Sequence, residues 1–218
     1  MKLATLKTLV VAAILVACAI SVSAQPVGPS IAFGIKGGGN LANFYGDAVG
    51  NVQAKLRAIG GAYLRFQFND VLGFQPEVLY AQKGAKQSEV VDLGGTLGVL
   101  SGEWHYDYIE IPLLLDFSVP TETGMTPHFY AGPTISVLAS AKAVADNGGE
   151  IDFKDYTKST DFSLTVGGGI NIGNGPVKFV LDLRYVMGLS TFDSAPLSDY
   201  LSRKNNTIAF MGGIQFGG

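Results

Sequence analysis

The amino-acid sequence predicts an all-β protein, an eight-stranded antiparallel up-and-down transmembrane β-barrel with a filled polar lumen. Three observations support this prediction. Eight segments alternate between apolar and polar residues, long and short connections alternate between these segments, and one face of every segment carries no charge. A period of two indicates a β-strand, because successive side chains of a strand point to opposite faces.

The first 24 residues, 1–24, are predicted to be a signal peptide. Lys2 and Lys7 form its basic start, residues 8–20 form an apolar stretch, and the small residues at 22–24 form a cleavage site. The alternative is a lipoprotein signal, because the four residues LVAC that end at Cys18 resemble a lipobox. The apolar run continues past Cys18, which favours cleavage after residue 24.

The remainder of the chain, 25–218, is predicted to be one outer-membrane β-barrel domain with strands between about 31 and 216. Charged residues make up 15% of the chain, against about 25% in a typical soluble domain. Glycine fills 29 of the 218 positions, well above the usual share of ~7%. Low charge combined with a high glycine content favours a membrane barrel over a water-soluble globule.

Charge and cysteine content exclude several classes of function. Cleavage after residue 24 would leave 13 basic residues, 18 acidic residues and no cysteine. An acidic chain argues against nucleic acid as a partner. A chain without cysteine has no thiol nucleophile and no cysteine-ligated metal, and we expect no cofactor.

Eight alternating segments follow the predicted signal peptide. They cover residues 31–44, 57–69, 71–84, 103–118, 127–141, 160–173, 176–190 and 205–216. Pro76, Pro112 and Pro133 lie within these segments. Because proline lacks the N–H group of a ladder hydrogen bond, β-bulges are expected to accommodate them.

The connections between the segments alternate strictly in length. Long polar connections cover residues 45–56, 85–102, 142–159 and 191–204, and short breaks cover 69–70, 120–126 and 173–176. Barrels of the outer membrane have short periplasmic turns, long external loops and an even number of strands. The observed order fits such a barrel if both termini lie in the periplasm, which predicts an integral outer-membrane protein.

One face of each segment is apolar or small throughout. In the first segment this face carries Ile31, Phe33 and Ile35, and in the seventh it carries Leu181 and Leu183. No residue on this face of any segment is charged. We therefore expect the face to contact lipid.

The opposite face carries five positive and five negative side chains among small polar residues. Buried charges need partners, so a balanced set predicts mutual pairing inside the barrel. An ion pathway is the alternative, but the interior of an eight-stranded barrel is only wide enough for side chains to fill it. The predicted structural network in the lumen consists of Lys36, Arg65, Glu77, Lys83, Glu110, Asp116, Asp161, Lys178, Asp182 and Arg184.

Phenylalanines gather near one end of the strands. With strand directions taken from the loop order, seven of the eight strands carry a phenylalanine near the periplasmic end. Aromatic girdles mark the membrane–water boundary of outer-membrane barrels. The predicted membrane-interface aromatics are Phe33, Phe68, Phe74, Phe117, Phe129, Phe179 and Phe216.

Six motifs follow one another along the predicted strands. They are GIKGGGNLANF (34–44), FQPEVLYAQKGAK (74–86), YIEIPLLLDF (108–117), FYAGPTISVL (129–138), VGGGINI (166–172) and LDLRYVMGL (181–189). Their order resembles the PorT-like outer-membrane β-barrel family of Bacteroidota. The resemblance spans nearly all of residues 30–216 and implies an eight-stranded barrel exported by the general secretory route. It implies that some members are associated with a protein-secretion system, and it supplies no shared catalytic residues.

Two groups of residues are candidates for a catalytic or metal-binding site. His105 lies beside Glu103 and Asp107, with Ser101 nearby, and these are the residue types of an acyl-transfer site. The second histidine, His128, is expected near the opposite end of the barrel. The long connection over 142–159 carries Asp146, Glu150, Asp152 and Asp155, which lack EF-hand spacing but leave a weak surface Ca²⁺ site open.

The sequence therefore predicts a non-enzymatic outer-membrane barrel with a role in envelope structure, surface contact or support of protein secretion. Its expected partners are outer-membrane lipid and envelope or secretion-system proteins, and the protein is expected to be a monomer. One alternative is an outer-membrane lipid-modifying enzyme that uses His105. Another is a secreted, soluble, lipocalin-like barrel, which requires the apolar faces to point inward around an apolar ligand.

Overall fold

The computed structural model describes residues 29–46, 52–92, 97–145, 149–152, 154, 158–190 and 203–218. The predicted signal peptide, including Cys18, lies outside these residues. The strands are β1 (Ser30–Gly46), β2 (Val52–Gln67), β3 (Leu72–Asp92), β4 (Leu97–Ser118), β5 (Met125–Ala145), β6 (Glu150–Asp152), β7 (Thr160–Ile172), β8 (Val177–Gly188) and β9 (Arg203–Gly217).

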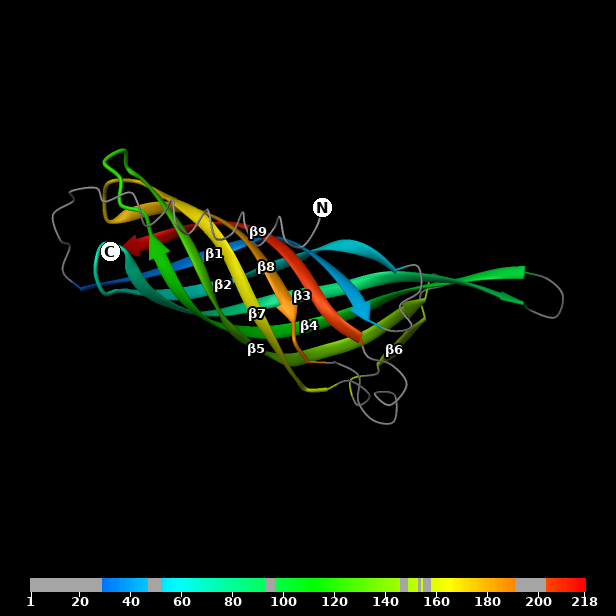
Figure 1. Ribbon diagram of the computed structural model, residues 1–218. Helices are drawn as coiled ribbons and strands as arrows, with labels where there is room; N and C mark the ends of the chain where they lie inside the picture. The colour runs from blue at the N-terminus through cyan, green and yellow to red at the C-terminus, as the bar shows by residue number, and fades with distance from the viewer. Residues whose placement is uncertain are drawn as a thin grey trace, which may run out of the picture.

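Eight of these described strands close into a single antiparallel barrel (Figure 1). Each wall strand pairs with its neighbours in the chain, β1 pairs with β9, and the pairing of β4 with β5 completes the ring. The three-residue strand β6 pairs only with β5 and adds no strand to the wall. The predicted eight-stranded barrel is confirmed. No helix in the described part of the chain is long and apolar enough to cross a membrane.

The two ends of the barrel differ. At one end, which we call the turn end, short connections join β2 to β3, β4 to β5 and β7 to β8, and β1 begins where β9 ends. The β2–β3 turn is held by Asn69, whose Oδ1 accepts hydrogen bonds from the backbone of Val71 and Leu72 at 2.9 and 2.8 Å. Gly124 and Gly173 have φ of 74° and 141°, a backbone region that glycine enters without a steric cost. We call the opposite end the loop end.

The connection expected over 85–102 is largely a β-ribbon rather than a loop. β3 and β4 stay paired from Leu72 and Phe117 out to Asp92 and Leu97, and Figure 1 shows this hairpin extending beyond the wall at the loop end. The prediction of a polar loop was wrong there because the segment contains Val90, Val91 and Val99, and valine favours strands. The connection over 142–159 likewise contains β6.

The three prolines for which the sequence predicts bulges, Pro76, Pro112 and Pro133, are accommodated without one. Pro76 pairs with Leu113, Pro112 with Thr134 and Pro133 with Leu164, and the register is the same on both sides of each proline. The register shifts lie elsewhere, between Ala54 and Ile59 and between Asp107 and Tyr108. A proline therefore costs its own ladder hydrogen bond but leaves the register of the strands unchanged.

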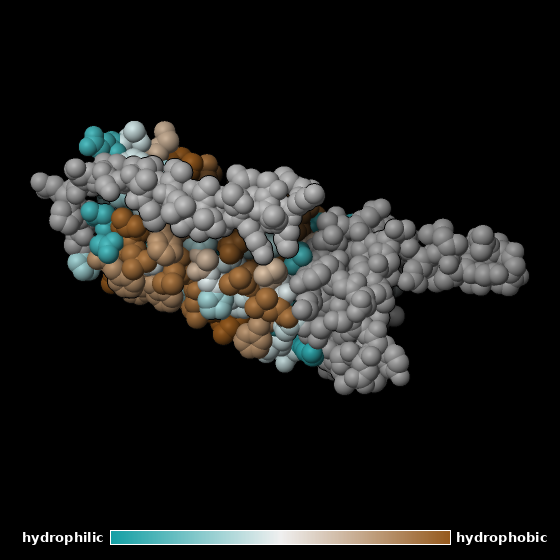
Figure 2. All heavy atoms as spheres, in the orientation of Figure 1, coloured by the Kyte–Doolittle hydropathy of each residue, from teal (hydrophilic) through white to brown (hydrophobic). Residues whose placement is uncertain are grey.

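The apolar face of the strands is the outer face of the barrel. Phe33 is 55% exposed and Leu183 is 57% exposed, whereas Lys36 and Arg184 are 5% and 2% exposed. Figure 2 shows hydrophobic residues gathered over the side of the barrel. The soluble, lipocalin-like alternative required the reverse arrangement and does not fit this structure.

Candidate functional site

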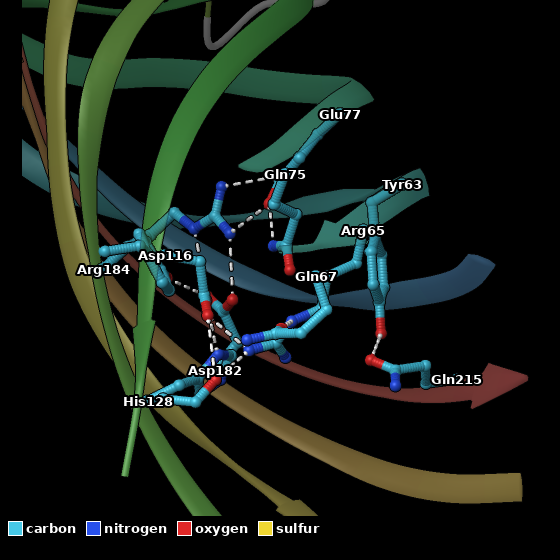
Figure 3. Close-up of polar contacts among 12 residues, drawn as sticks. Tyr63, Arg65, Gln67, Gln75, Glu77, Asp116, His128, Asp182, Arg184 and Gln215 are labelled. Atoms are coloured by element: carbon cyan, nitrogen blue, oxygen red, sulfur yellow. Dashed lines mark hydrogen bonds and ion pairs between the residues drawn. The ribbon is translucent and has the colours of Figure 1, made fainter. Parts of the chain in front are cut away.

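Four charged side chains meet in the middle of the lumen and form what we call the central cluster. The Nζ of Lys36 lies 2.8 Å from Glu77 Oε1 and 3.0 Å from Asp182 Oδ2. The guanidinium of Arg184 lies 2.8 Å from Glu77 Oε2 and 2.9 Å from Asp182 Oδ2. Because β1, β3 and β8 supply these residues, the cluster ties widely separated strands across the lumen (Figure 3). Two cations and two carboxylates leave no net charge.

Neutral side chains complete this cluster. Tyr130 donates a hydrogen bond from its hydroxyl to Asp182 Oδ1 at 2.8 Å, and Gln75 Nε2 donates to Glu77 Oε1 at 2.7 Å. The Nζ of Lys36 lies 5.1 Å from the ring centre of Tyr63, and the Arg184 guanidinium carbon lies 5.2 Å from that of Tyr130. Both distances suit cation–π contacts. Both carboxylates therefore have several donors, as buried charges require.

A second group, the turn-end cluster, centres on Asp116 in β4. Arg65 Nη2 donates hydrogen bonds to Asp116 and to Ser118, the latter at 2.7 Å. On the other side of the carboxylate, His128 Nδ1 lies 2.8 Å from Asp116 Oδ2. Figure 3 shows Arg65 and His128 approaching this carboxylate from different strands. His128 is thus a buried partner of a lumen charge, a role that the sequence prediction did not include.

On the loop side of the central cluster, buried apolar side chains form what we call the apolar layer, beside polar residues such as Glu110, which pairs with Leu79, and Asn40, which pairs with Ala209. The layer consists of Ile59, Leu79, Ala81, Ala209 and Met211, all buried.

Beside this apolar layer, Lys83 Nζ lies 2.6 Å from Glu110 Oε1 and 5.2 Å from the ring centre of Tyr108. From the turn end towards the loop end, the described lumen therefore holds the turn-end cluster, the central cluster, and then the apolar layer together with this ion pair.

The remaining two residues of the predicted network have neutral partners. Lys178 lies at the turn end, half-buried, and donates a hydrogen bond to the carbonyl oxygen of Gly218 at 2.8 Å. Asp161 is buried and accepts a hydrogen bond from Ser190. A cavity of about 270 Å³ at the turn end is lined by Arg65, Lys178 and other polar residues. Eight of the ten predicted residues therefore meet opposite charges, while these two bond to neutral groups.

Inward-facing glycines make room for the large polar side chains. Gly34 pairs with Tyr63 and Gly167 pairs with Tyr130, each directly across from its partner on the neighbouring strand. A Cβ atom on Gly34 would lie 2.5 Å from the Tyr63 ring, and one on Gly167 would lie 2.6 Å from the Tyr130 hydroxyl. The signal that sequence reasoning missed is this pairing of glycine with an inward aromatic residue. It becomes visible only once the register is known.

The histidine considered for catalysis has a different setting. His105 Nε2 lies 3.3 Å from Glu103 Oε2, and Glu103 also pairs with Lys55. Asp107 instead accepts a hydrogen bond from the Tyr80 hydroxyl at 2.8 Å. The side chain of Ser101 lies outside the described residues, so the nucleophile of the acyl-transfer hypothesis is not placed.

The acidic connection is described only in part. Asp152 is exposed, while Asp146, Asp155 and the side chain of Glu150 lie outside the described residues. Among the residues that are described, no group of three or more His, Cys, Asp or Glu side chains could hold a metal ion. The Ca²⁺ hypothesis stays a prediction.

The seven phenylalanines of the predicted girdle lie on the outer surface near the turn end. Phe33, Phe68, Phe117, Phe129 and Phe179 are exposed, and Phe74 and Phe216 are half-buried. The rings of Phe33 and Phe216 stack with centres 5.1 Å apart across the β1–β9 pair. The ring of aromatic residues is therefore present as a geometric feature.

A closed β-wall with an apolar exterior and a charged interior defines a membrane-spanning β-barrel protein. The chain belongs to the family of outer membrane protein β-barrel domains, which it matches over residues 23–194. It is thus an integral outer-membrane protein. No curated protein matches the sequence.

Solved structures of outer-membrane barrels share the fold. The chain is similar to Neisserial surface protein A (NspA), with a TM-score of 0.50, 12% identity, and coverage of 88% of this chain and 99% of that one. It is also similar to OprG from Pseudomonas aeruginosa, with a TM-score of 0.49, 12% identity, and coverage of 91% and 99%. For Ail from Yersinia pestis the TM-score is 0.44, the identity 16%, and the coverage 87% and 100%.

Proposed function

We propose that this protein is a non-enzymatic outer-membrane anchor whose closed barrel holds its loop end at the cell surface for contact with other proteins. The observation that carries the proposal is the obstruction of the lumen. The central cluster and the apolar layer lie in series inside the same narrow wall. A barrel filled in this way supports a role in display rather than in transport.

The energetics of the lumen argue against a conduit. A hydrated ion would have to displace Lys36 or Arg184 from two carboxylates each, which would leave buried charges without partners. It would then have to pass the apolar layer at Leu79 and Met211, whose side chains cannot replace the water around an ion. Both steps oppose passage.

The proposed orientation places the turn end in the periplasm. The short turns, the start of β1 and the end of β9 all lie at the turn end. Outer-membrane barrels have short periplasmic turns and long external loops. The phenylalanine ring from Phe33 to Phe216 would then lie at the inner boundary of the membrane. The β3–β4 hairpin and β6 would lie outside the cell.

The outer face supports lipid as the main partner of the wall. Exposed apolar residues such as Ile35, Leu115 and Leu183 occur on different strands around the barrel. We propose a monomer, since lipid alone can solvate this face. The resemblance to PorT-like barrels makes envelope or secretion-system proteins one class of partner for the loop end.

Conductance measurements test the obstruction. Wild-type protein reconstituted in planar bilayers is expected to give no steady ohmic current above that of bilayers treated with detergent alone. The reason is that the bonds of Lys36 and Arg184 to Glu77 cross the lumen. A stable unitary conductance of the wild type would contradict the anchor proposal.

Single-cysteine labelling tests the orientation. Lys154→Cys places a thiol on an exposed residue at the loop end, and Glu122→Cys places one in an exposed turn at the opposite end. In intact cells, a membrane-impermeant maleimide is expected to label Lys154→Cys at once and Glu122→Cys only after the outer membrane is permeabilised. The reverse pattern would place the loop end in the periplasm. Cys18 does not interfere if the signal peptide is removed.

A further inference from the structure

The outer part of the β3–β4 hairpin is a two-stranded ribbon with two free edges. We call residues 88–92 and 97–101 the β3–β4 ribbon. β3 pairs with β2 only as far as Gln87, and β4 pairs with β5 only from Gly102 onward. Beyond these points the ribbon strands pair only with each other, among the residues that the structure describes, from Ser88 with Ser101 to Asp92 with Leu97.

A ribbon of this kind is a template for a further strand. Each edge presents backbone N–H and C=O groups that have no ladder partner in the described part of the chain, and two strands alone are marginally stable in water. Proteins protect exposed edges with proline, lysine or bulges. The ribbon has no proline and no basic residue, and its β3–β4 register runs without a shift.

We propose that the β3–β4 ribbon is a strand-addition site that binds an extended segment of a partner protein with basic side chains. The partner strand would pair with a free edge through main-chain hydrogen bonds, and its side chains would supply the selectivity. This inference rests on the proposed function, because it requires the loop end to be available to other proteins.

The charge of the ribbon identifies the kind of partner. Glu89 and Asp92 are its only charged residues, and apolar residues such as Val90 and Val99 occupy paired positions between them. Because Glu89 and Asp92 lie three positions apart on β3, they belong to opposite faces of the ribbon. A segment that alternates valine-like residues with lysine or arginine would place its basic residues on the face of one carboxylate and its apolar residues beside valine on the other face.

A second copy of the chain fits the ribbon less well than a basic segment. Two copies in one membrane have the same orientation, so a two-fold axis along the membrane normal would bring identical edges together in parallel. Parallel pairing is slightly weaker than antiparallel pairing. Pairing through the two β3 edges would also gather Glu89 and Asp92 from both copies at one seam, where like charges repel.

The test uses the full-length protein in lipid nanodiscs and a synthetic seven-residue peptide, Lys-Val-Thr-Val-Lys-Val-Thr. A matched peptide carries N-methyl groups on alternate backbone nitrogens, which removes donors from one edge and keeps every side chain. Calorimetry is expected to show saturable binding of the first peptide and at least about tenfold weaker binding of the second, because several main-chain hydrogen bonds are lost.

Two variants complete the experiment. Replacement of residues 88–101 by Asn-Gly removes the ribbon and is expected to abolish binding, with heat-modifiable gel mobility as the check that the barrel still folds. The double substitution Glu89→Gln and Asp92→Asn keeps the strands and is expected to weaken binding of the lysine peptide several-fold.

Equal affinity for the two peptides, or binding that survives removal of the ribbon, would overturn the proposal. Ribbon-dependent dimerisation without peptide binding would do so as well and would assign the edge to a second copy. None of these outcomes bears on conductance or on cysteine labelling, so failure of the strand-addition site and failure of the anchor proposal are distinguishable.

Discussion

Glu77 holds the central cluster together at the scale of a single residue. It accepts hydrogen bonds from Lys36 at 2.8 Å, from Gln75 at 2.7 Å, and from two nitrogens of Arg184 at 2.8 and 3.1 Å. Its replacement by glutamine, Glu77→Gln, would keep the size of the side chain but leave two buried cations facing one carboxylate. Loss of one partner of a buried ion pair costs about 3–5 kcal/mol.

We therefore expect Glu77→Gln to lower the free energy of unfolding by about 3–5 kcal/mol in reversible urea titrations of the protein in liposomes. The control is Glu122→Gln, in an exposed turn, for which a change within about 0.5 kcal/mol is expected. Similar small changes for both variants would show that the cluster contributes little to stability.

The paired glycines give a second prediction at this scale. A methyl group at Gly167 would lie 2.6 Å from the Tyr130 hydroxyl and would displace the hydrogen bond from Tyr130 to Asp182. Gly167→Ala is expected to destabilise the barrel by about 1–3 kcal/mol through overpacking. Gly212→Ala, where the nearest atom to a Cβ is 4.0 Å away, is the matched control and should be nearly neutral. Comparable losses in both would mean that strand glycines act through the backbone alone.

Residue types in the lumen were predictable, but their contacts were not. Alternation along each strand places Lys36, Glu77 and Arg184 on the face opposite the uncharged one, since the side-chain period of a strand is two. Which carboxylate meets which cation depends on the stagger of strands far apart in the chain, and no local pattern specifies it. Tyr130 and His128 were overlooked for the same reason, because their partners Asp182 and Asp116 lie on other strands.

At the scale of the element, strand positions followed from alternation and strand ends did not. The eight predicted segments all fall on wall strands. In each of them, apolar residues at every second position form one face for lipid, as in the strands of a transmembrane barrel. The predicted third segment ended at Gly84, short of the end of β3 at Asp92, because the alternation of apolar and polar residues weakens there. Beyond that point, cross-strand pairing between β3 and β4 continues with no wall to impose a buried face.

The ribbon also yields a prediction about elements. Because its residues pair only with each other in the described structure, replacing residues 88–101 by Asn-Gly should leave the wall intact. The free energy of unfolding is expected to stay the same or rise by about 1–2 kcal/mol, since a shorter connection costs less closure entropy.

A deeper deletion is the control for this element. Removing Ala81–Tyr108 with the same turn takes away residues that also pair with β2 and β5, and folding should fail. The measurement is heat-modifiable mobility followed by urea titration. A marked loss of stability on removing the ribbon alone would show that it supports the wall.

For the whole molecule, an apolar outside and a charged inside make sense only if the surrounding medium is less polar than the lumen. Depth then governs the cost of a charge on the outer face. Leu183 lies in the middle of β8 and is 57% exposed, while Val71 lies in the β2–β3 turn and is also exposed. In a transmembrane barrel, arginine at the midplane costs about 2–4 kcal/mol and near the interface only about 0–1 kcal/mol.

We expect Leu183→Arg to reduce the free energy of folding into liposomes by about 2–4 kcal/mol and Val71→Arg to reduce it by no more than about 1 kcal/mol. In a barrel surrounded by water, both arginines would be solvated and neither substitution would matter. Equal, small effects would therefore argue that hydrocarbon does not contact Leu183. A large difference that shrinks as the lipid chains are shortened would connect the cost to the depth of the residue in the bilayer, because a thinner bilayer brings the middle of β8 closer to water.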